Sequence, residues 1–183
     1  MQTRLDPKKL VFIDETAAST DMTRRYGRGA RGERLVCKVP HGHWKTSTFV
    51  AALRHNRVTA PLLLDGPMSG QSFRAYVEQI LAPTLKCDDI VIMDNVGVHK
   101  VAGVREAIEA RGAILLYLPP YSPDLNPIEQ FFSKLKSVLR RASARSIEAL
   151  WGIIGACLAD FTPRECASYI ANSGYGQPYR KML

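Results

Sequence analysis

The sequence predicts an α/β domain in which helices pack on a mixed sheet. Short apolar runs typical of buried strands alternate with longer segments whose apolar residues recur at helical spacing. Along the chain the expected order is a strand, three further strands, a helix, a strand, a helix, a strand and then helices only. A chain of 183 residues with 46% hydrophobic content can bury one sizeable core. We therefore expect residues 1–183 to form a single domain.

The first part of the chain is predicted to form a β-meander. Residues 9–15 (KLVFIDE) are a short apolar run that ends in acids, which suits a central strand buried on both faces. Residues 20–34 are rich in Gly and Arg and are interpreted as a loop or an irregular arm. Three further strands, separated by His, Gly and Asn turn signals, are expected at residues 33–40, 46–54 and 58–65.

The second part of the chain alternates helices with strands. A helix that begins with Ser69 as a candidate cap is followed by a second buried strand, by a helix that Gly112 closes, and by a third apolar strand. Three helical patterns complete the chain, the last of them weaker than the others. The expected ranges are 69–85 (helix), 88–95 (strand), 101–112 (helix), 113–120 (strand), and 127–142, 146–159 and 163–171 (helices).

Charge and cysteine content narrow the classes of function. Lys and Arg outnumber Asp and Glu by 25 to 17, for a net charge of +8, which favours a polyanionic partner such as nucleic acid. The four cysteines are scattered without a C-x-x-C pair, so neither a zinc site nor a disulfide framework is indicated. The N-terminus lacks an apolar signal core and no run approaches the length of a membrane span. We expect a cytoplasmic protein that associates with the nucleoid when DNA is bound and has no membrane partner.

Acidic residues follow two of the predicted core strands. Asp14 with Glu15 and Asp94 with Asn95 stand where these strands are expected to end. Active sites of open α/β sheets gather outside the carboxyl ends of strands, so catalysis is expected here. Each acid taken singly is also compatible with a solvated turn residue.

Glu129 has two interpretations. With Asn126 as N-cap and Pro127 at the first helical position, Glu129 falls third and completes a capping-box pattern. Alternatively, it belongs to a polar face shared with Lys136 and Arg140, opposite an apolar stripe at 3.6-residue spacing. An acid at the end of a basic track suits a metal site beside a phosphate backbone, although a solvated, charge-compensated face would show the same pattern.

Three blocks of sequence resemble the catalytic blocks of DDE transposases of bacterial insertion sequences related to the mariner group. These blocks are VFIDE, IVIMDN with a following HK, and YSPDLNPIEQFFSKLK. In that family two Asp and one Glu bind two divalent metal ions, and the matching residues here are Asp14, Asp94 and Glu129. Between Asp94 and Glu129 lie 34 residues, a separation typical of this group. The resemblance covers residues 9–169 and implies a ribonuclease H-like fold, shared with retroviral integrases, with helices on both faces of a mixed central sheet.

The resemblance also implies a reaction. Two metal ions would promote cleavage of DNA at transposon ends and joining of the freed 3′-hydroxyl to target DNA, within a homodimer in the active complex. All-carboxylate ligation favours hard cations, so Mg²⁺ is expected and Mn²⁺ is a substitute. Relatives carry an N-terminal helix-turn-helix region, which we expect this chain to lack because it begins almost at the first catalytic strand. Two alternatives remain open: a structure-specific nuclease without strand transfer, and an inactive transposase-derived DNA-binding protein.

Further residues are candidates for DNA contact or for an accessory role. Asn95 and His99 could orient water or touch DNA, with a turn Asn and a surface His as the alternative. Flexible, basic residues 20–34 are interpreted as a DNA-contacting arm, with a solubilising loop as the alternative. The DNA-contacting candidates are Lys136 and Arg140 on the helix, Lys100 after the second strand, and Arg24, Arg25, Arg28, Arg31 and Arg34 in the arm.

Overall fold

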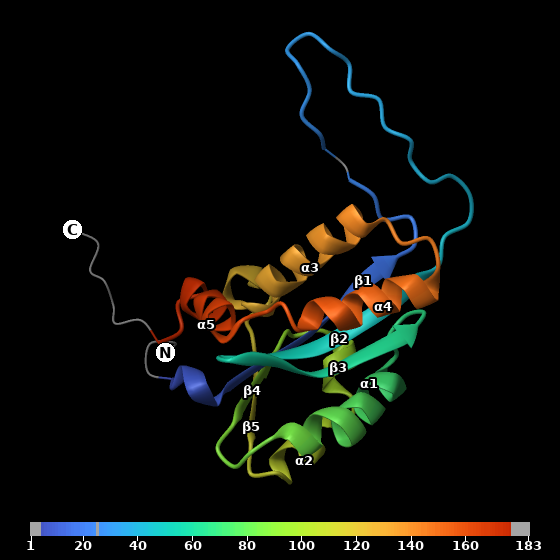
Figure 1. Ribbon diagram of the computed structural model, residues 1–183. Coiled ribbons are helices and arrows are strands. Elements are labelled where there is room, and N and C mark those ends of the chain that lie inside the picture. Colours follow the sequence, from blue (N-terminus) through green and yellow to red (C-terminus); the bar gives the residue numbers. More distant parts are fainter. Residues whose placement is uncertain (1–4, 25, 177–183) are drawn as a thin grey trace, which may run out of the picture.

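A computed structural model describes residues 5–24 and 26–176 and contains a five-stranded mixed sheet (Figure 1). The strands lie in the order β3-β2-β1-β4-β5, so the first strand of the sequence is central. β1 pairs antiparallel with β2 and parallel with β4, while β2–β3 is antiparallel and β4–β5 is parallel. The strands are β1 (Leu10–Ser19), β2 (Thr46–Arg54), β3 (Arg57–Asp65), β4 (Ile90–Met93) and β5 (Ile114–Tyr117).

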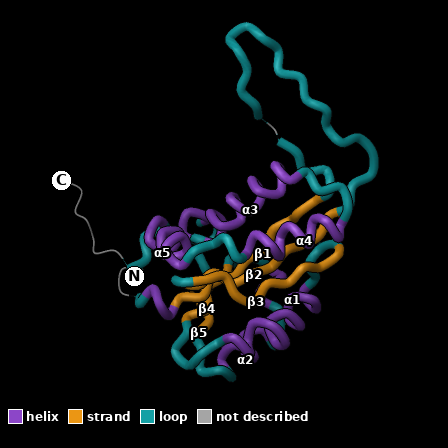
Figure 2. Tube along the Cα trace, in the orientation of Figure 1, coloured by secondary structure: helices purple, strands orange, loops and turns teal. Residues whose placement is uncertain are grey.

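Helices cover both faces of this sheet, as expected (Figure 2). One face packs against α3 (Ile128–Ala142), α4 (Ile147–Leu158) and α5 (Pro163–Asn172), and the other packs against α1 (Gly70–Tyr76) and α2 (Val104–Glu109). Side chains alternate along β1, so Leu10 and Phe12 enter the first core and Val11 and Ile13 enter the second. The central strand is therefore buried on both sides. Among the helices that the structure describes, we find no candidate for a membrane-spanning segment.

The meander has three strands, and the prediction of a further strand at residues 33–40 is wrong. These residues form no strand and are almost entirely exposed, including Leu35, Val36 and Val39. Both edges of β1 are already paired, with β2 and β4, so no neighbouring position beside the central strand is left for this segment. Apolar residues alone do not make a strand, because strand preference depends on packing against neighbouring strands.

The helix expected at residues 69–85 begins as predicted but changes its geometry. The Ser69 hydroxyl accepts a hydrogen bond from the backbone N–H of Ser72 at 3.1 Å, as a helix cap does. α1 then widens into a π-helical turn (Val77–Leu81) and tightens into a 3-10 turn (Ala82–Thr84). Pro83 lies in that last turn, where it has no N–H to continue the α-helical ladder. The three C-terminal helices agree with the expected ranges to within a few residues.

Residues 20–45, which we call the arm, connect β1 to β2 and project away from the body of the domain (Figure 1). The arm closes at its root, because the Thr20 N–H donates to the Lys45 carbonyl at 3.0 Å and the Lys45 N–H donates to the Thr20 hydroxyl at 3.1 Å. Arg145, in the turn between α3 and α4, donates from Nη1 to the carbonyls of Thr20 and Met22. The root is thus attached to the domain while most of the arm is exposed.

Candidate active site

Strand register brings Asp14 and Asp94 next to each other. In the parallel β1–β4 pair, Ile13 is opposite Met93, and the next residue on each strand is an aspartate. Adjacent strands lie about 4.8 Å apart, so the two carboxylates start from neighbouring backbone positions. Asp94 follows the end of β4 as expected, but Asp14 lies within β1, because β1 continues its pairing with β2 as far as Ser19. The prediction that both acids stand at strand ends is therefore correct for Asp94 and wrong for Asp14.

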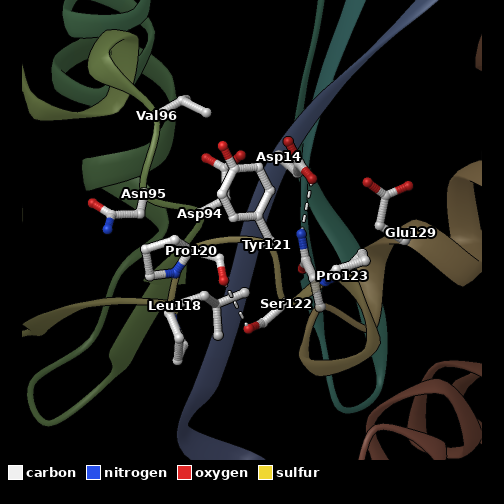
Figure 3. A pocket seen from close by; sticks show the side chains of 12 residues that line it. Asp14, Asp94, Asn95, Val96, Leu118, Pro120, Tyr121, Ser122, Pro123 and Glu129 are labelled. Carbon is white, nitrogen blue, oxygen red and sulfur yellow. Dashed lines mark hydrogen bonds between the residues drawn. The ribbon is translucent and has the colours of Figure 1, made fainter.

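Asp14, Asp94 and Glu129 line one cavity of about 390 Å³ (Figure 3). Asp14 is buried, Asp94 is half-buried, and Glu129 reaches the cavity from the first turn of α3, where it is exposed. The segment from Leu118 to Pro123 forms another wall, and three of its residues are prolines. Proline restricts the backbone, so this wall holds the approach to α3 in a defined conformation. The three acids that the sequence singled out thus line one cavity, although they come from three separate segments of the chain.

Glu129 does not complete a capping box. α3 begins at Ile128, with Pro127 at the cap position and no capping hydrogen bond from a side chain. Asn126 is buried, and its Nδ2 donates to Asp14 Oδ2 at 2.8 Å instead of capping the helix. The capping interpretation is wrong because the Asn126 amide is engaged by a buried carboxylate. The Glu129 carboxylate is consequently not held by a cap and remains directed to the cavity.

The environment of Asp14 suits a cation. Burial is the main cause that raises the pKa of Asp14 to about 7. The Glu15 backbone N–H donates to Asp14 Oδ1 at 2.8 Å and acts to lower this pKa. The negative charges of Asp94, Glu15 and Glu129 act to raise it. Near neutral pH, this carboxyl is therefore partly protonated unless positive charge is supplied. A hard divalent cation prefers carboxylate oxygens, so the residues on this cavity fit such an ion.

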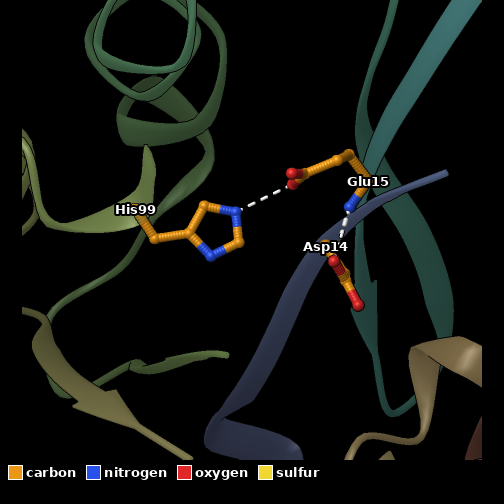
Figure 4. A group of neighbouring side chains, drawn as sticks. All are labelled: Asp14, Glu15 and His99. Carbon is orange, nitrogen blue, oxygen red and sulfur yellow. Dashed lines mark hydrogen bonds and ion pairs between the residues drawn. The ribbon is translucent and has the colours of Figure 1, made fainter. Parts of the chain in front are cut away.

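His99 connects two of the acids. Its ring is fully buried, with Nδ1 2.5 Å from Asp94 Oδ1 and Nε2 2.8 Å from Glu15 Oε2 (Figure 4 shows the Glu15 contact). Burial by itself lowers the pKa of His99, but the hydrogen bonds to Asp94 and Glu15 outweigh it and raise the pKa to about 10. The Phe73 ring lies against the imidazole at 4.4 Å between centroids. The alternative that His99 is a surface residue is wrong, and its burial excludes direct contact with DNA.

Glu15 was not among the predicted site residues, although it stands next to Asp14. Because side chains alternate along β1, Asp14 faces the α3 layer while Glu15 faces the α1 layer, where His99 lies. Ligand atoms of Asp14, Glu15 and His99 all lie within 4.8 Å of one another and form a second group that could hold a metal. Both His99 nitrogens already face carboxylates, however, and an imidazolium has no lone pair for a metal. A ligand set of carboxylates alone, as on the cavity, presents no such obstacle to a hard cation.

Asn95, an accessory candidate, and Lys100, a DNA-contacting candidate, differ in whether they line the cavity. Asn95 lines the cavity and is half-buried, as an accessory residue requires. Lys100 is exposed and does not line the cavity; its ammonium lies 5.6 Å from the centroid of the Tyr117 ring. Only Asn95 of these two is therefore placed to act directly at the cavity.

The basic DNA-contacting candidates lie along α3 and on the arm. Lys136 and Arg140 are half-buried, and Arg140 lines a second cavity of about 310 Å³ together with Ser19, Asp21 and residues of the arm. α3 thus runs from the candidate active site to the arm root. The arm arginines that the structure describes, Arg24, Arg28, Arg31 and Arg34, are exposed, and Arg25 lies outside the described residues.

Comparisons with known proteins agree with this architecture. A family model described as "DDE superfamily endonuclease" matches residues 9–151. Among curated proteins, none matches the chain in sequence. Similar solved structures include a pre-cleavage Mos1 transpososome, with a TM-score of 0.75, 16% identity, and coverage of 91% of this chain and 53% of that chain. The catalytic domain of Mos1 mariner transposase gives a TM-score of 0.68 at 16% identity and covers 91% of this chain and 77% of that one.

A Mos1 mariner paired end complex with Mn is also similar, with a TM-score of 0.73, 18% identity, and coverage of 90% of this chain and 52% of that chain. At these identities the likeness concerns the fold, and it confirms the predicted ribonuclease H-like architecture. This chain spans about half the length of the transpososome chains that it matches.

Proposed function

The chain belongs to the DDE superfamily endonucleases, whose family model matches residues 9–151, and from this premise we propose that it is the catalytic domain of a transposase. Its reaction is cleavage of DNA at transposon ends followed by joining of the freed 3′-hydroxyl to target DNA. The observation that carries this proposal is the meeting of Asp14, Asp94 and Glu129 on one cavity. Mos1 structures with Mg and with Mn support the choice of either ion as cofactor.

Asp14, Asp94 and Glu129 are the residues that would hold two divalent ions, Mg²⁺ or Mn²⁺. When bound, such ions lower the pKa of an attacking water and stabilise the negative charge on the leaving 3′-oxygen. The burial of Asp14 and the negative charges around it favour cation binding over an empty, fully ionised site. The proposal therefore gives a physical reason for placing three carboxylates together.

The other side chains of the site position these acids. His99 contacts Asp94 on one side and Glu15 on the other, which ties the segment after β4 to β1. The proline-containing wall fixes the approach to α3 and thus the origin of the Glu129 side chain. Fixed carboxylates are required because a catalytic constellation must be held to within about 0.5 Å of its productive geometry.

DNA and a second copy of the chain are the proposed partners. Lys136 and Arg140, on the helix that starts at Glu129, are proposed to contact backbone phosphates of the strand being cleaved. The arm also exposes large apolar side chains, among them Tyr26 at 92% and Val36 at 86%. These exposed side chains are available to a protein partner, and we propose that this partner is a second copy of the chain in the active complex.

A pre-nicked transposon-end duplex tests the reaction. The protein is incubated with this duplex, a supercoiled target plasmid and Mg²⁺ or Mn²⁺, and the DNA products are resolved on a denaturing gel. We expect both cleavage and a joined product, and neither product with Asp94→Asn. Cleavage without joining would instead identify a nuclease, and DNA binding without either product would identify an inactive DNA-binding protein.

A further inference from the structure

The Asp14 carboxylate is held at both oxygens. The backbone N–H of Glu15 donates to Oδ1 at 2.8 Å, and Nδ2 of Asn126 donates to Oδ2 at 2.8 Å. The first donor belongs to β1 itself, whereas the second comes from the residues that lead into α3. Asn126 is therefore the side chain that joins the central strand to the helix carrying Glu129.

The other half of the Asn126 amide has no partner. Asn126 is only 4% exposed and lines the candidate active-site cavity, yet its Oδ1 accepts no hydrogen bond within the described part of the chain. A buried polar atom without a partner destabilises the folded protein, and native structures rarely leave one unsatisfied. A carbonyl oxygen needs a donor, and the carboxylates around this cavity offer none when ionised.

We propose, on the basis of the metal-dependent function proposed above, that Asn126 is a positioning residue of the metal site. Its amide nitrogen fixes the Asp14 carboxylate, and its carbonyl oxygen accepts a hydrogen bond from a water molecule that hydrates a divalent ion at Asp14. Mg²⁺ retains several of its waters when proteins bind it, so such a donor accompanies the ion. The bound ion thereby completes the hydrogen bonding of Asn126.

The backbone of Asn126 explains why this position, rather than another, carries the amide. Its N–H donates to the Pro123 carbonyl at 3.0 Å, and its carbonyl accepts from the Glu129 N–H at 3.2 Å. One residue thus contacts the proline-containing wall, the first turn of α3 and Asp14. A shift of Asn126 would change the separation between the Asp14 and Glu129 carboxylates, which is the quantity that a shared metal site requires to be constant.

The inference is tested by Mn²⁺ titration calorimetry on the whole chain without DNA, using Asn126→Ala and a matched control. Gln130→Ala removes a nearby amide in the first turn of α3. The Gln130 Nε2 donates at 3.3 Å to the Tyr169 carbonyl and to the Ser173 hydroxyl, away from the cavity. We expect Asn126→Ala to weaken Mn²⁺ binding by about 10–100-fold, the usual effect of losing a partner of a metal ligand. Gln130→Ala should retain wild-type affinity. Thermal melting without metal establishes that each variant is folded.

Each outcome of this titration has a separate meaning. If the folded wild type binds no Mn²⁺, the proposed metal-dependent function and this inference both fail. If the wild type binds Mn²⁺ and Asn126→Ala binds it equally well, only the inference fails. Equal losses in Asn126→Ala and Gln130→Ala would assign both amides to the general stability of α3 and overturn the positioning role.

Should Asn126→Ala not fold, Asn126→Ser takes its place. The shorter serine side chain keeps a polar group at the cavity wall but can make at most one of the two contacts. We expect Asn126→Ser to bind Mn²⁺ more weakly than the wild type, and wild-type affinity in this variant would overturn the inference.

Discussion

The candidate active site and the arm differ in how their side chains are held. At the cavity, Asp14 lies on β1 and accepts two hydrogen bonds, while Asp94 directly follows β4 and contacts a fully buried His99. The arm is joined to the domain at Thr20 and Lys45, while its described arginines and most of its described apolar side chains are exposed. One region is fixed by the core and the other presents its groups to solvent.

From this difference we infer separate functions for the two regions, with catalysis at the cavity and partner binding on the arm. Catalytic carboxylates must keep their geometry, so they are placed where the core determines it. Positive charges that bind phosphates, and apolar groups that bind a protein, act on partners that arrive from outside and can be carried on an exposed segment. If the two functions are separate, substitutions at the cavity abolish cleavage without affecting DNA binding. Substitutions in the arm weaken DNA binding without affecting the metal site.

The largest expected effect is at the three acids. Asp14→Ala, Asp94→Ala and Glu129→Ala should each reduce metal-dependent cleavage by about 1,000-fold or more, equivalent to about 4 kcal/mol, because each removes a ligand of a shared site. Gel assays of cleavage measure the loss, and salt-dependent DNA binding should be unchanged. Full activity in any one variant would remove that residue from the proposed triad.

Glu129→Gln sharpens the same test. Because Glu129 forms no capping box, the change should cost less than about 1 kcal/mol of stability, the size of its interaction with the helix dipole. Cleavage should nevertheless be lost with the charge. A large drop in melting temperature together with retained cleavage would restore a structural role for this residue.

A smaller effect is expected at His99, which acts through Asp94. His99→Ala removes the imidazolium between Asp94 and Glu15 and should lower the cleavage rate by about 10–100-fold. The substitution should also lower the free energy of unfolding by about 2–3 kcal/mol. This loss is smaller than for breaking a fully buried ion pair, because Asp94 is partly exposed. Gel assays and thermal melting measure the two effects. His55→Ala, directly after β2, serves as the histidine control, and equal losses in both variants would contradict the specific role of His99.

In the arm, the effect should be on DNA binding alone. Replacing Arg24, Arg28, Arg31 and Arg34 together by Gln should reduce the slope of log affinity against log salt concentration by up to about 3–4 units, or about 0.9 for each lost contact to duplex DNA. Mn²⁺ affinity should not change, because these side chains are exposed and do not line the cavity. Fluorescence anisotropy at several salt concentrations gives the slope. An unchanged slope would mean that these arginines make no phosphate contacts, so that only a protein partner would remain for the arm.

The smallest expected effect concerns α3, which connects the two regions. Replacing Lys136 and Arg140 by Gln should lower the salt slope of DNA binding by about one to two units across unrelated sequences, because phosphate contacts do not read bases. The same anisotropy titrations measure it, with Mn²⁺ affinity as the control. Unchanged salt dependence would mean that this face of α3 is only a solvated helix surface.

Sequence patterns predicted the regular part of the fold because burial leaves a periodic signal. The double-sided burial of β1, the two later strands and the three C-terminal helices follow from such patterns. The strand expected at residues 33–40 does not form, because a strand depends on pairing and packing with its neighbours as well as on its composition. Leu35, Val36 and Val39 are apolar, yet they remain exposed in the arm.

The acids of the site were predictable, but most of their partners were not. A recognisable motif identified Asp14, Asp94 and Glu129, and the structure brings them to one cavity. The burial of His99 and its contact with Glu15 depend on the packing of β1 against the segment after β4, far away in sequence. Asn126 was interpreted as a cap because the local pattern fits one, and only the tertiary structure places Asp14 within its reach.

The central claim, that the three acids form one metal site, is tested most directly by anomalous diffraction from crystals grown with Mn²⁺. We expect anomalous peaks in the cavity, with ions contacted by the carboxylates of Asp14, Asp94 and Glu129. Cavity peaks should disappear in Asp14→Asn crystals. A peak held by Glu15 and His99 instead, or an absence of peaks in the cavity at saturating Mn²⁺, would contradict the account.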